Sequence, residues 1–416
     1  MIPLTASPAS TRPQWRAFLE LGFRPLYLLA TLWGAASIAL WLYTPAWLSN
    51  TAIPSLYWHA HEMLWAFIGT IAVGFLLTAS ATWTGQTTLR GPSLGALCLI
   101  WILARFSLLL PNGLLAALLL DALFFAIAAA ELARVILIAR NKRNYGIPVA
   151  MLALGLSHSR FMYSLMQGDD PMPYFYSGFW TMGLITLLIA RRIIPFFAMR
   201  ALPGLSLPAQ TRSGHWQMGL SALAIGLSLT PWRLPLALTL AALGLIACYQ
   251  WIRWQPWASR HTPLLWILYL GYAGLALGLL SAAAYEAGWI ARAAWPVHIV
   301  GLAGFSVMII GMLTRTALGH LGRPLRATPK VVLSYAFLIA ACVLRLLALI
   351  PSSWSLPLLH LAGLCWILAM LNYLHQSARM LLRPSRNCSL RQRHTLPPQA
   401  PGAMYLYFLS DRACLY

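Results

Sequence analysis

GLLAALLLDALFFAIAAAELA, residues 113–133, is a run of 21 residues in which nearly every side chain is apolar. An α-helix rises about 1.5 Å per residue, so roughly 20 apolar residues cross the ~30 Å hydrocarbon core of a bilayer. Similar windows fill most of the chain, near residues 26–43, 62–81, 93–110, 146–166, 174–194, 214–231, 234–252, 263–284, 295–314, 331–350 and 355–375. The sequence therefore predicts an all-α, polytopic membrane helix bundle with about twelve transmembrane helices.

The composition of the 416 residues agrees with a membrane protein, because 60% are hydrophobic and only 9% are charged. Ordinary soluble domains carry roughly 25% charged residues. A formal net charge of +21 would also suit a nucleic-acid-binding protein. Here the basic residues lie between the apolar windows and form no continuous face, so we expect a lipid bilayer as partner and no nucleic acid. The six cysteines show no C-x-x-C spacing and predict no zinc site.

The basic residues also predict the orientation of the helices. Successive loops and chain ends are assigned in turn to one side of the bilayer and then to the other, which gives two sets. One set holds 24 of the 29 Lys and Arg residues, among them Arg191, Arg192 and Arg315. Short loops rich in Lys and Arg stay in the cytoplasm. We therefore expect both termini in the cytoplasm, with a single transmembrane domain over residues 1–386 and a mobile cytoplasmic tail over 387–416. The first window lacks a cleavage pattern and is expected to remain as a span.

Five of the ten histidines fall in one layer on the outer side of this predicted bundle. They are His59, His61, His158, His298 and His360, and they come from four of the windows. Helix bundles build metal and cofactor sites from side chains on facing helices, and imidazole suits copper, iron and haem iron. On a regular helix His59 and His61 would point about 200° apart. They share one metal if this segment is extended, and otherwise each serves a different centre.

Charged residues at the same depth need partners, because an isolated charge in the bilayer is costly. Glu62 could orient a metal-ligating imidazole without binding the metal itself. Arg105, Arg160 and Arg345 lie within windows, and Asp121 can neutralise one of them. Haem propionates would satisfy the surplus arginines, with Arg105 and Arg345 as the candidates. Contacts between arginine and backbone carbonyls are the alternative.

A faint internal repeat links two of the windows. His61 precedes Gly74 by thirteen residues, and His298 precedes Gly311 by the same number. Chance is the alternative explanation for this spacing. On the cytoplasmic side, His320 lies in a Gly-His-x-Gly turn that brings backbone and imidazole close to one point, so it is a further candidate metal ligand.

Several of these stretches together resemble the NnrS family of membrane proteins, which are associated with haem, copper and the response to nitric oxide. The matching stretches are GFRP (22–25), WHAHEM (58–63), GFLLT (74–78), WTG (83–85), RRIIPFF (191–197) and TRTALGHLGRPL (314–325), together with His298. The resemblance covers roughly residues 22 to 325, and the twelve-span architecture matches as well.

The resemblance implies a haem- and copper-binding inner-membrane protein of nitric oxide metabolism, in denitrification or nitrosative stress. The candidate metal ligands are His59, His61, His298, His320 and His360, with Glu62, Arg105 and Arg345 as cofactor-binding residues. Sensing, scavenging and protection of iron are open alternatives for what the protein does with nitric oxide.

Two other classes of function compete with this interpretation. The first is a secondary transporter, possibly of an anion, that uses the intramembrane arginines. The second is an enzyme related to nitric oxide reductases, which would need a proton path. With eight acidic residues in the whole chain such a path is poorly supplied, so catalysis ranks lowest.

Overall fold

In the computed structural model the described helices fall into three successive sets of four rods. The first set spans most of the N-terminal third of the chain. The structure describes residues 14–48 and 51–384, and in these ranges it contains helices and turns but no strand. The set comprises α1 (Trp15–Phe18), α2 (Phe23–Tyr43), α3 (Pro45–Leu48), α4 (Ser55–His61), the π-helical segment η1 (Glu62–Gly69), α5 (Thr70–Thr84), α6 (Pro92–Leu108) and α7 (Leu114–Ile138). Because α4, η1 and α5 are continuous, they form one long rod.

Two further sets follow with the same order of helices. The second comprises the short turn η2 (Lys142–Asn144), α8 (Gly146–Gln167), α9 (Met172–Ala201), α10 (Thr211–Leu227) and α11 (Arg233–Arg253). The third comprises the turn η3 (Pro256–Ser259), α12 (Pro263–Glu286), α13 (Ala294–His298), the π-helical segment η4 (Ile299–Ser306), α14 (Val307–His320), α15 (Pro329–Leu347) and α16 (Ser355–Leu381). In each set the second rod is long, with 30, 30 and 27 residues, and the third is short, with 17, 17 and 19.

The predicted membrane bundle is confirmed in its class. Each of the twelve windows coincides with one of these rods, and within the described residues nine rods are long and apolar enough to cross a bilayer. The rods that include α6, α8 and α10 fall short of that measure. The predicted tail over 387–416 lies outside the described residues.

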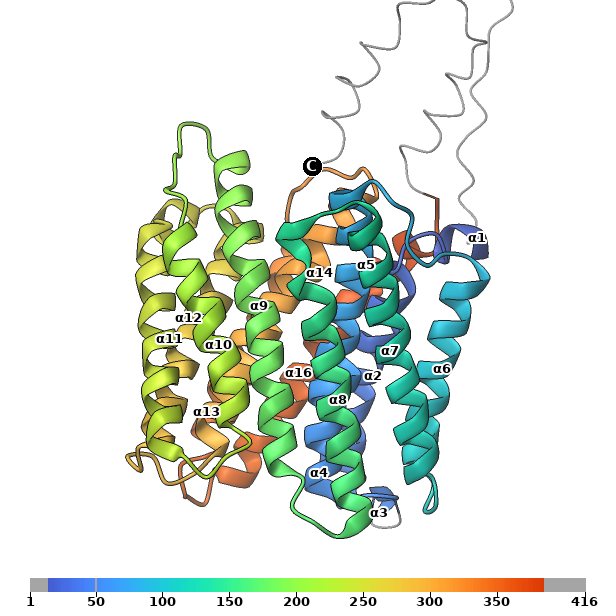
Figure 1. Ribbon diagram of the computed structural model, residues 1–416, viewed down its shortest axis with the longest axis vertical. Coiled ribbons are helices and arrows are strands. Elements are labelled where there is room, and N and C mark those ends of the chain that lie inside the picture. Colours follow the sequence, from blue (N-terminus) through green and yellow to red (C-terminus); the bar gives the residue numbers. More distant parts are fainter. Residues whose placement is uncertain (1–13, 49–50, 385–416) are drawn as a thin grey trace, which may run out of the picture.

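The rods stand side by side, with α1 at one end of the bundle and α3, α4 and α13 at the other (Figure 1). Each set packs its last helix on the first helix of the next, α7 on α8 and α11 on α12, and α16 returns to α2. The ring closes at the α1 end, where the amide of Gln14 donates to the carbonyl of Leu382 at 2.9 Å. Both ends of the described chain therefore lie at the same end of the bundle.

The internal repeat seen in the sequence has a structural counterpart. The π-helical segments η1 and η4 each have eight residues, and they begin directly after His61 and His298. A π-helical turn is wider than an α-helical one and is frequent at functional sites, because it changes the direction of the side chains around it. The two histidines thus occupy equivalent places in the first and third sets.

Small residues bring α12 against η4. A Cβ built on Gly274 would lie 2.3 Å from the carbonyl oxygen of Ala303, and one built on Gly278 would lie 2.9 Å from the amide of Val300. Backbone atoms cannot move aside as a side-chain end can. Close approach of helix backbones at small residues is a common way to stabilise membrane bundles.

Gly274→Ala is therefore expected to destabilise the bundle by about 1–3 kcal/mol, the usual cost of an overpacked core. The matched control is Gly219→Ala in α10, where an added Cβ would meet no atom within 4 Å. Thermal unfolding of the two purified variants in the same detergent measures the difference. Equal melting temperatures would contradict the packing argument.

Candidate functional site: a buried histidine–aspartate cluster and an aromatic cavity

Two histidines and an aspartate meet in the interior of the bundle. His61 ends α4, Asp121 lies in α7 and His158 lies in α8, and all three side chains are buried. The Nε2 atoms of the two imidazoles are 2.9 Å apart, and they lie 3.6 Å and 3.4 Å from Oδ2 of Asp121. Their candidate ligand atoms all fall within 4.8 Å of one another, the spacing of groups that can hold one metal ion. We call these three residues the His–Asp cluster.

Charged and polar neighbours hold the His–Asp cluster in place. Glu62 Oε1 accepts a hydrogen bond from Nδ1 of His61 at 2.7 Å, and the indole of Trp33 donates to its other oxygen. The guanidinium of Arg105 pairs with Asp121 and lies 3.6 Å from Glu62. Two buried carboxylates thus face one buried guanidinium. With neutral imidazoles the group carries a formal charge of −1, which a bound cation or an extra proton would balance.

The hydrogen bonds also set the direction of the imidazole lone pairs. Because Nδ1 of His61 donates to Glu62, the neutral ring presents an Nε2 lone pair toward His158. Nδ1 of His158 is buried and has no hydrogen-bond partner. A carboxylate on the far nitrogen of a ligating histidine fixes its tautomer and raises its basicity. The two Nε2 atoms and Asp121 therefore form a donor set that fits a transition-metal ion.

A second feature lies between other rods of the same bundle. A cavity of about 290 Å³ is enclosed by α2, α4–η1, α9, α13–η4, α15 and α16, and we call it the aromatic cavity. Its walls include Trp41, Phe67, Phe179 and Trp366. Leu56, which is 66% exposed, lies at its rim, so the cavity opens on the surface of the bundle.

The polar groups of the aromatic cavity are few and come from separate rods. They include His59 from α4, His298 from α13 and Arg345 from α15. The ring of His59 stacks on Trp41, with centroids 4.1 Å apart, and its buried Nδ1 makes no hydrogen bond. Nδ1 of His298 donates to the carbonyl of Ala294 at 2.7 Å, which leaves the Nε2 lone pair free.

The structure separates the two histidines of the WHAHEM motif. Both lie in the helical segment α4, so the alternative of an extended segment in which they share one metal is wrong. His59 lines the aromatic cavity, whereas His61 belongs to the His–Asp cluster. Each histidine faces a different group of residues.

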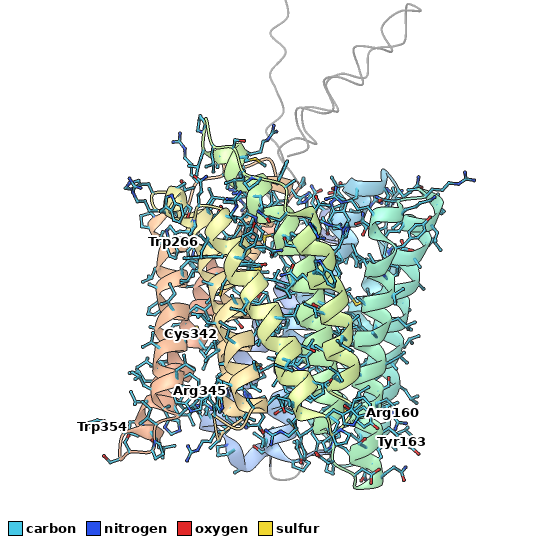
Figure 2. The ribbon with its side chains drawn as sticks, turned by 60° about the vertical axis from the view of Figure 1, so that its left-hand side comes forward. Arg160, Tyr163, Trp266, Cys342, Arg345 and Trp354 are labelled. Carbon is cyan, nitrogen blue, oxygen red and sulfur yellow. The ribbon has the colours of Figure 1, made fainter. Side chains whose placement is uncertain are left out.

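Several other predicted residues lie away from the places that we expected. Arg105 pairs with Asp121 and lies 3.6 Å from Glu62, so it adjoins the His–Asp cluster and does not line the aromatic cavity. Arg160 is exposed and donates to the hydroxyl of Tyr174 at 2.9 Å, near the same end of the bundle as Arg345 (Figure 2). Neither Arg105 nor Arg160 lines the aromatic cavity.

Two predicted metal ligands stand apart from both features. His360, in α16, packs its ring against Tyr43, 5.5 Å between centroids, and does not line the aromatic cavity. His320, at the end of α14, is exposed and contacts the ring of Phe23. Neither residue belongs to the group of three candidate metal ligands found in the described part of the chain, so their roles as metal ligands stay predictions.

Asp121 and His158 are the site residues that the sequence analysis did not propose as ligands. The signal was present for both. The sequence predicts that Asp121 neutralises one intramembrane arginine, and it places His158 in the outer layer of histidines. What was missing is the packing of α7 on α8, which brings the two side chains together.

The family of the chain follows from a comparison over almost its whole length. A family profile described as NnrS protein matches residues 17–385. The chain belongs to the NnrS family. None of the curated proteins compared with it matches. The NnrS profile covers every residue of the His–Asp cluster and of the polar part of the aromatic cavity, and it links the chain to the response to nitric oxide.

Proposed function

We propose that this NnrS protein binds haem and copper in the bacterial inner membrane and acts in nitric oxide metabolism or the nitrosative-stress response. Its twelve rods would all span the bilayer, with both ends in the cytoplasm. The observation that carries the proposal is the pair His59 and His298, which reach one apolar cavity from different helices with ring nitrogens free for a ligand.

The aromatic cavity suits haem by its chemistry. Haem iron is commonly held by histidine, and the surrounding wall controls what reaches the metal. Arg345 is the cationic group of the cavity and would pair with a propionate. The volume of about 290 Å³ is near the lower limit of small-molecule sites, about 300 Å³.

An apolar cavity also favours the expected small ligand. Nitric oxide is uncharged and dissolves in the bilayer, so it can enter through the opening without a water-filled pore. A bound haem iron would supply the metal that binds it. The residues of the chain would then hold the haem and keep water out, with Trp41 fixing the ring plane of His59.

The His–Asp cluster is the proposed copper site. Imidazole nitrogens with a carboxylate oxygen suit copper, iron and zinc, and the formal charge of −1 favours a cation. Glu62 would orient His61, while Arg105 would hold Asp121 in place. This assignment requires no side chain from the aromatic cavity, so the two centres can be tested separately.

The proposed orientation rests on charge. When all twelve rods cross the bilayer, the basic loops and chain ends fall on one side. We assign this side to the cytoplasm, because short loops rich in Lys and Arg stay there. The hydrogen bond between Gln14 and Leu382 supports an even number of crossings.

Haem content tests the proposal. Protein purified from cells supplied with haem is expected to show a Soret band, and His59→Ala or His298→Ala is expected to remove most of it, because each removes an imidazole that would hold the haem iron. His360→Ala and His320→Ala are the matched controls and are expected to keep the wild-type spectrum. A wild-type protein without haem, or full haem content in both cavity variants, would refute the assignment.

A further inference from the structure

A groove opens on the exposed surface of the second set of helices, between the start of α10 and the end of α11. Its volume is about 440 Å³, and its walls include Arg212, Ser213 and Trp216 from α10 with Ile246 and Tyr249 from α11. It lies at the α1 end of the bundle, where α10 begins (Figure 1). We call it the α10–α11 groove, and it shares no residue with the aromatic cavity or the His–Asp cluster.

The α10–α11 groove belongs to a part of the chain whose positive charge is not balanced within it. Residues 171–285 contain no Asp or Glu, whereas they contain seven arginines: Arg191, Arg192, Arg200, Arg212, Arg233, Arg253 and Arg260. Glu286, the next acid along the chain, pairs with Arg233. Because α10 has no acid in its first turn, the positive end of its helix dipole adds to this charge. An anion at the groove is therefore favoured.

A second arginine lies against the same turn of α10. Arg191 of α9 belongs to the RRIIPFF stretch, which the proposed function leaves unused, and a Cβ built on Gly214 would overlap its guanidinium. Its Nε is buried and has no hydrogen-bond partner in the described chain. The first turn of α10 thus has the guanidinium of Arg191 against its backbone and that of Arg212 in the groove.

The aromatic side chains of the groove indicate where the membrane surface lies. Trp216 is 63% exposed and Tyr249 is 51% exposed, and Trp and Tyr concentrate where the hydrocarbon meets the lipid headgroups. Leu223, two turns beyond Trp216, and Leu245, one turn before Tyr249, are exposed on the same faces of the two helices. The groove therefore has a cationic end and an apolar continuation along the bundle.

The length of α10 brings headgroups toward this cationic end. α10 has 17 residues, which at about 1.5 Å per residue is less than the ~30 Å of hydrocarbon that a span must cross. Beside a short helix the bilayer thins locally, so the phosphates of the adjacent lipids move toward the helix end.

We infer that the α10–α11 groove binds one anionic phospholipid, with its phosphate paired to Arg212 and its acyl chains along the exposed face that carries Leu223 and Leu245. Basic pockets between membrane helices suit anionic headgroups, because the guanidinium and the phosphate attract each other at the edge of the hydrocarbon. A soluble phosphate would use only the cationic end, whereas a lipid also covers the apolar continuation. The inference does not depend on the haem or copper proposals.

Lipid binding by delipidated full-length protein tests the inference. The protein in detergent is mixed with equal amounts of phosphatidylglycerol and phosphatidylcholine that carry the same acyl chains, and native mass spectrometry measures the lipid bound per chain. We expect one phosphatidylglycerol per chain to be held in preference to phosphatidylcholine. Arg212→Gln is expected to weaken that preference about fivefold, the effect of one basic residue close to an anionic headgroup.

The matched control is Arg90→Gln, which removes the same charge at the equivalent place in the first set. Arg90 is exposed and lies just before α6, as Arg212 lies at the start of α10, and the neighbouring amide of Gly91 donates to Leu19 beside α1. This variant is expected to keep the wild-type preference. Phosphatidylglycerol with brominated chains gives a second readout, because bromine quenches a nearby indole, and Trp216→Phe is expected to lose part of that quenching.

Four results would overturn the inference. They are a wild-type protein without preference for phosphatidylglycerol, an unchanged preference in Arg212→Gln, an equal loss in Arg90→Gln, and unchanged quenching in Trp216→Phe. Displacement of the lipid by inorganic phosphate would assign the groove to a soluble anion instead. Arg212 is exposed, so its replacement leaves the core of the bundle intact, and the melting temperature of the variant checks this.

Discussion

Arg105→Leu is expected to destabilise the folded protein by about 3–5 kcal/mol, the usual cost of removing one partner from a buried ion pair. The guanidinium of Arg105 is the cation that faces both Asp121 and Glu62, and all three side chains are buried. Without it, two carboxylates stay in the interior with only imidazoles and an indole as partners. Thermal unfolding in detergent and the yield of monodisperse protein measure the loss.

The control is Arg160→Leu, which removes an exposed arginine whose hydrogen bond goes to Tyr174. Surface changes of this kind usually stay within about 0.5 kcal/mol. The double variant Arg105→Leu with Asp121→Asn should recover part of the stability, because it removes the opposing charges together and the two sites are in contact. Similar melting temperatures for Arg105→Leu and Arg160→Leu would show that the ion pair contributes little.

The class of fold could be predicted because the length of an apolar run is a strong physical constraint. Every window chosen from the sequence coincides with a helical rod. The ends were less accurate, since a hydropathy window stops where polar residues begin. Residues 55–61 and 315–320 continue their helices past that point, with His59 and Arg315 among them.

The sequence allowed a prediction of the depth at which the site residues lie, but not of the residues that their side chains face. Loop charge placed the histidines in one layer, and the 100° per residue of a helix predicted that a helical segment would turn His59 and His61 apart. The partners of each residue depend on which helices pack together. The prediction that Asp121 neutralises one intramembrane arginine is confirmed by its pair with Arg105. The contact of α7 with α8 and the two π-helical segments have no signature in composition, so the meeting of His158 with His61 and Asp121 could not be predicted.

The two proposed centres differ in function because of these helix contacts. His59 and His61 are two residues apart, yet one lines an apolar cavity and the other lies between carboxylates. A largely apolar cavity with few polar groups, among them the cationic Arg345, favours a large, mostly apolar cofactor with an anionic edge. A compact group with a formal charge of −1 favours a bare cation. The electrostatics of each place therefore argues for a different occupant.

His61→Ala and His158→Ala are each expected to abolish copper binding at the His–Asp cluster while the Soret band of the protein persists. Each change removes one of three donors whose atoms lie within 4.8 Å of one another, and the two remaining groups cannot complete the site. Metal analysis of protein loaded with copper and then washed measures the loss. Glu62→Gln should be milder, about 10–100-fold in affinity, because Glu62 acts through the orientation of His61.

His59→Ala is the control for this experiment, since it alters the neighbouring motif residue but leaves the cluster intact. It is expected to lose haem and keep copper, the reverse of His61→Ala. Joint loss of both cofactors in either variant would mean that the two histidines serve one centre, against their placement on separate faces of α4. Copper retained in both His61→Ala and His158→Ala would locate the metal elsewhere. The reciprocal pattern follows only if a metal ion occupies the His–Asp cluster and haem occupies the aromatic cavity.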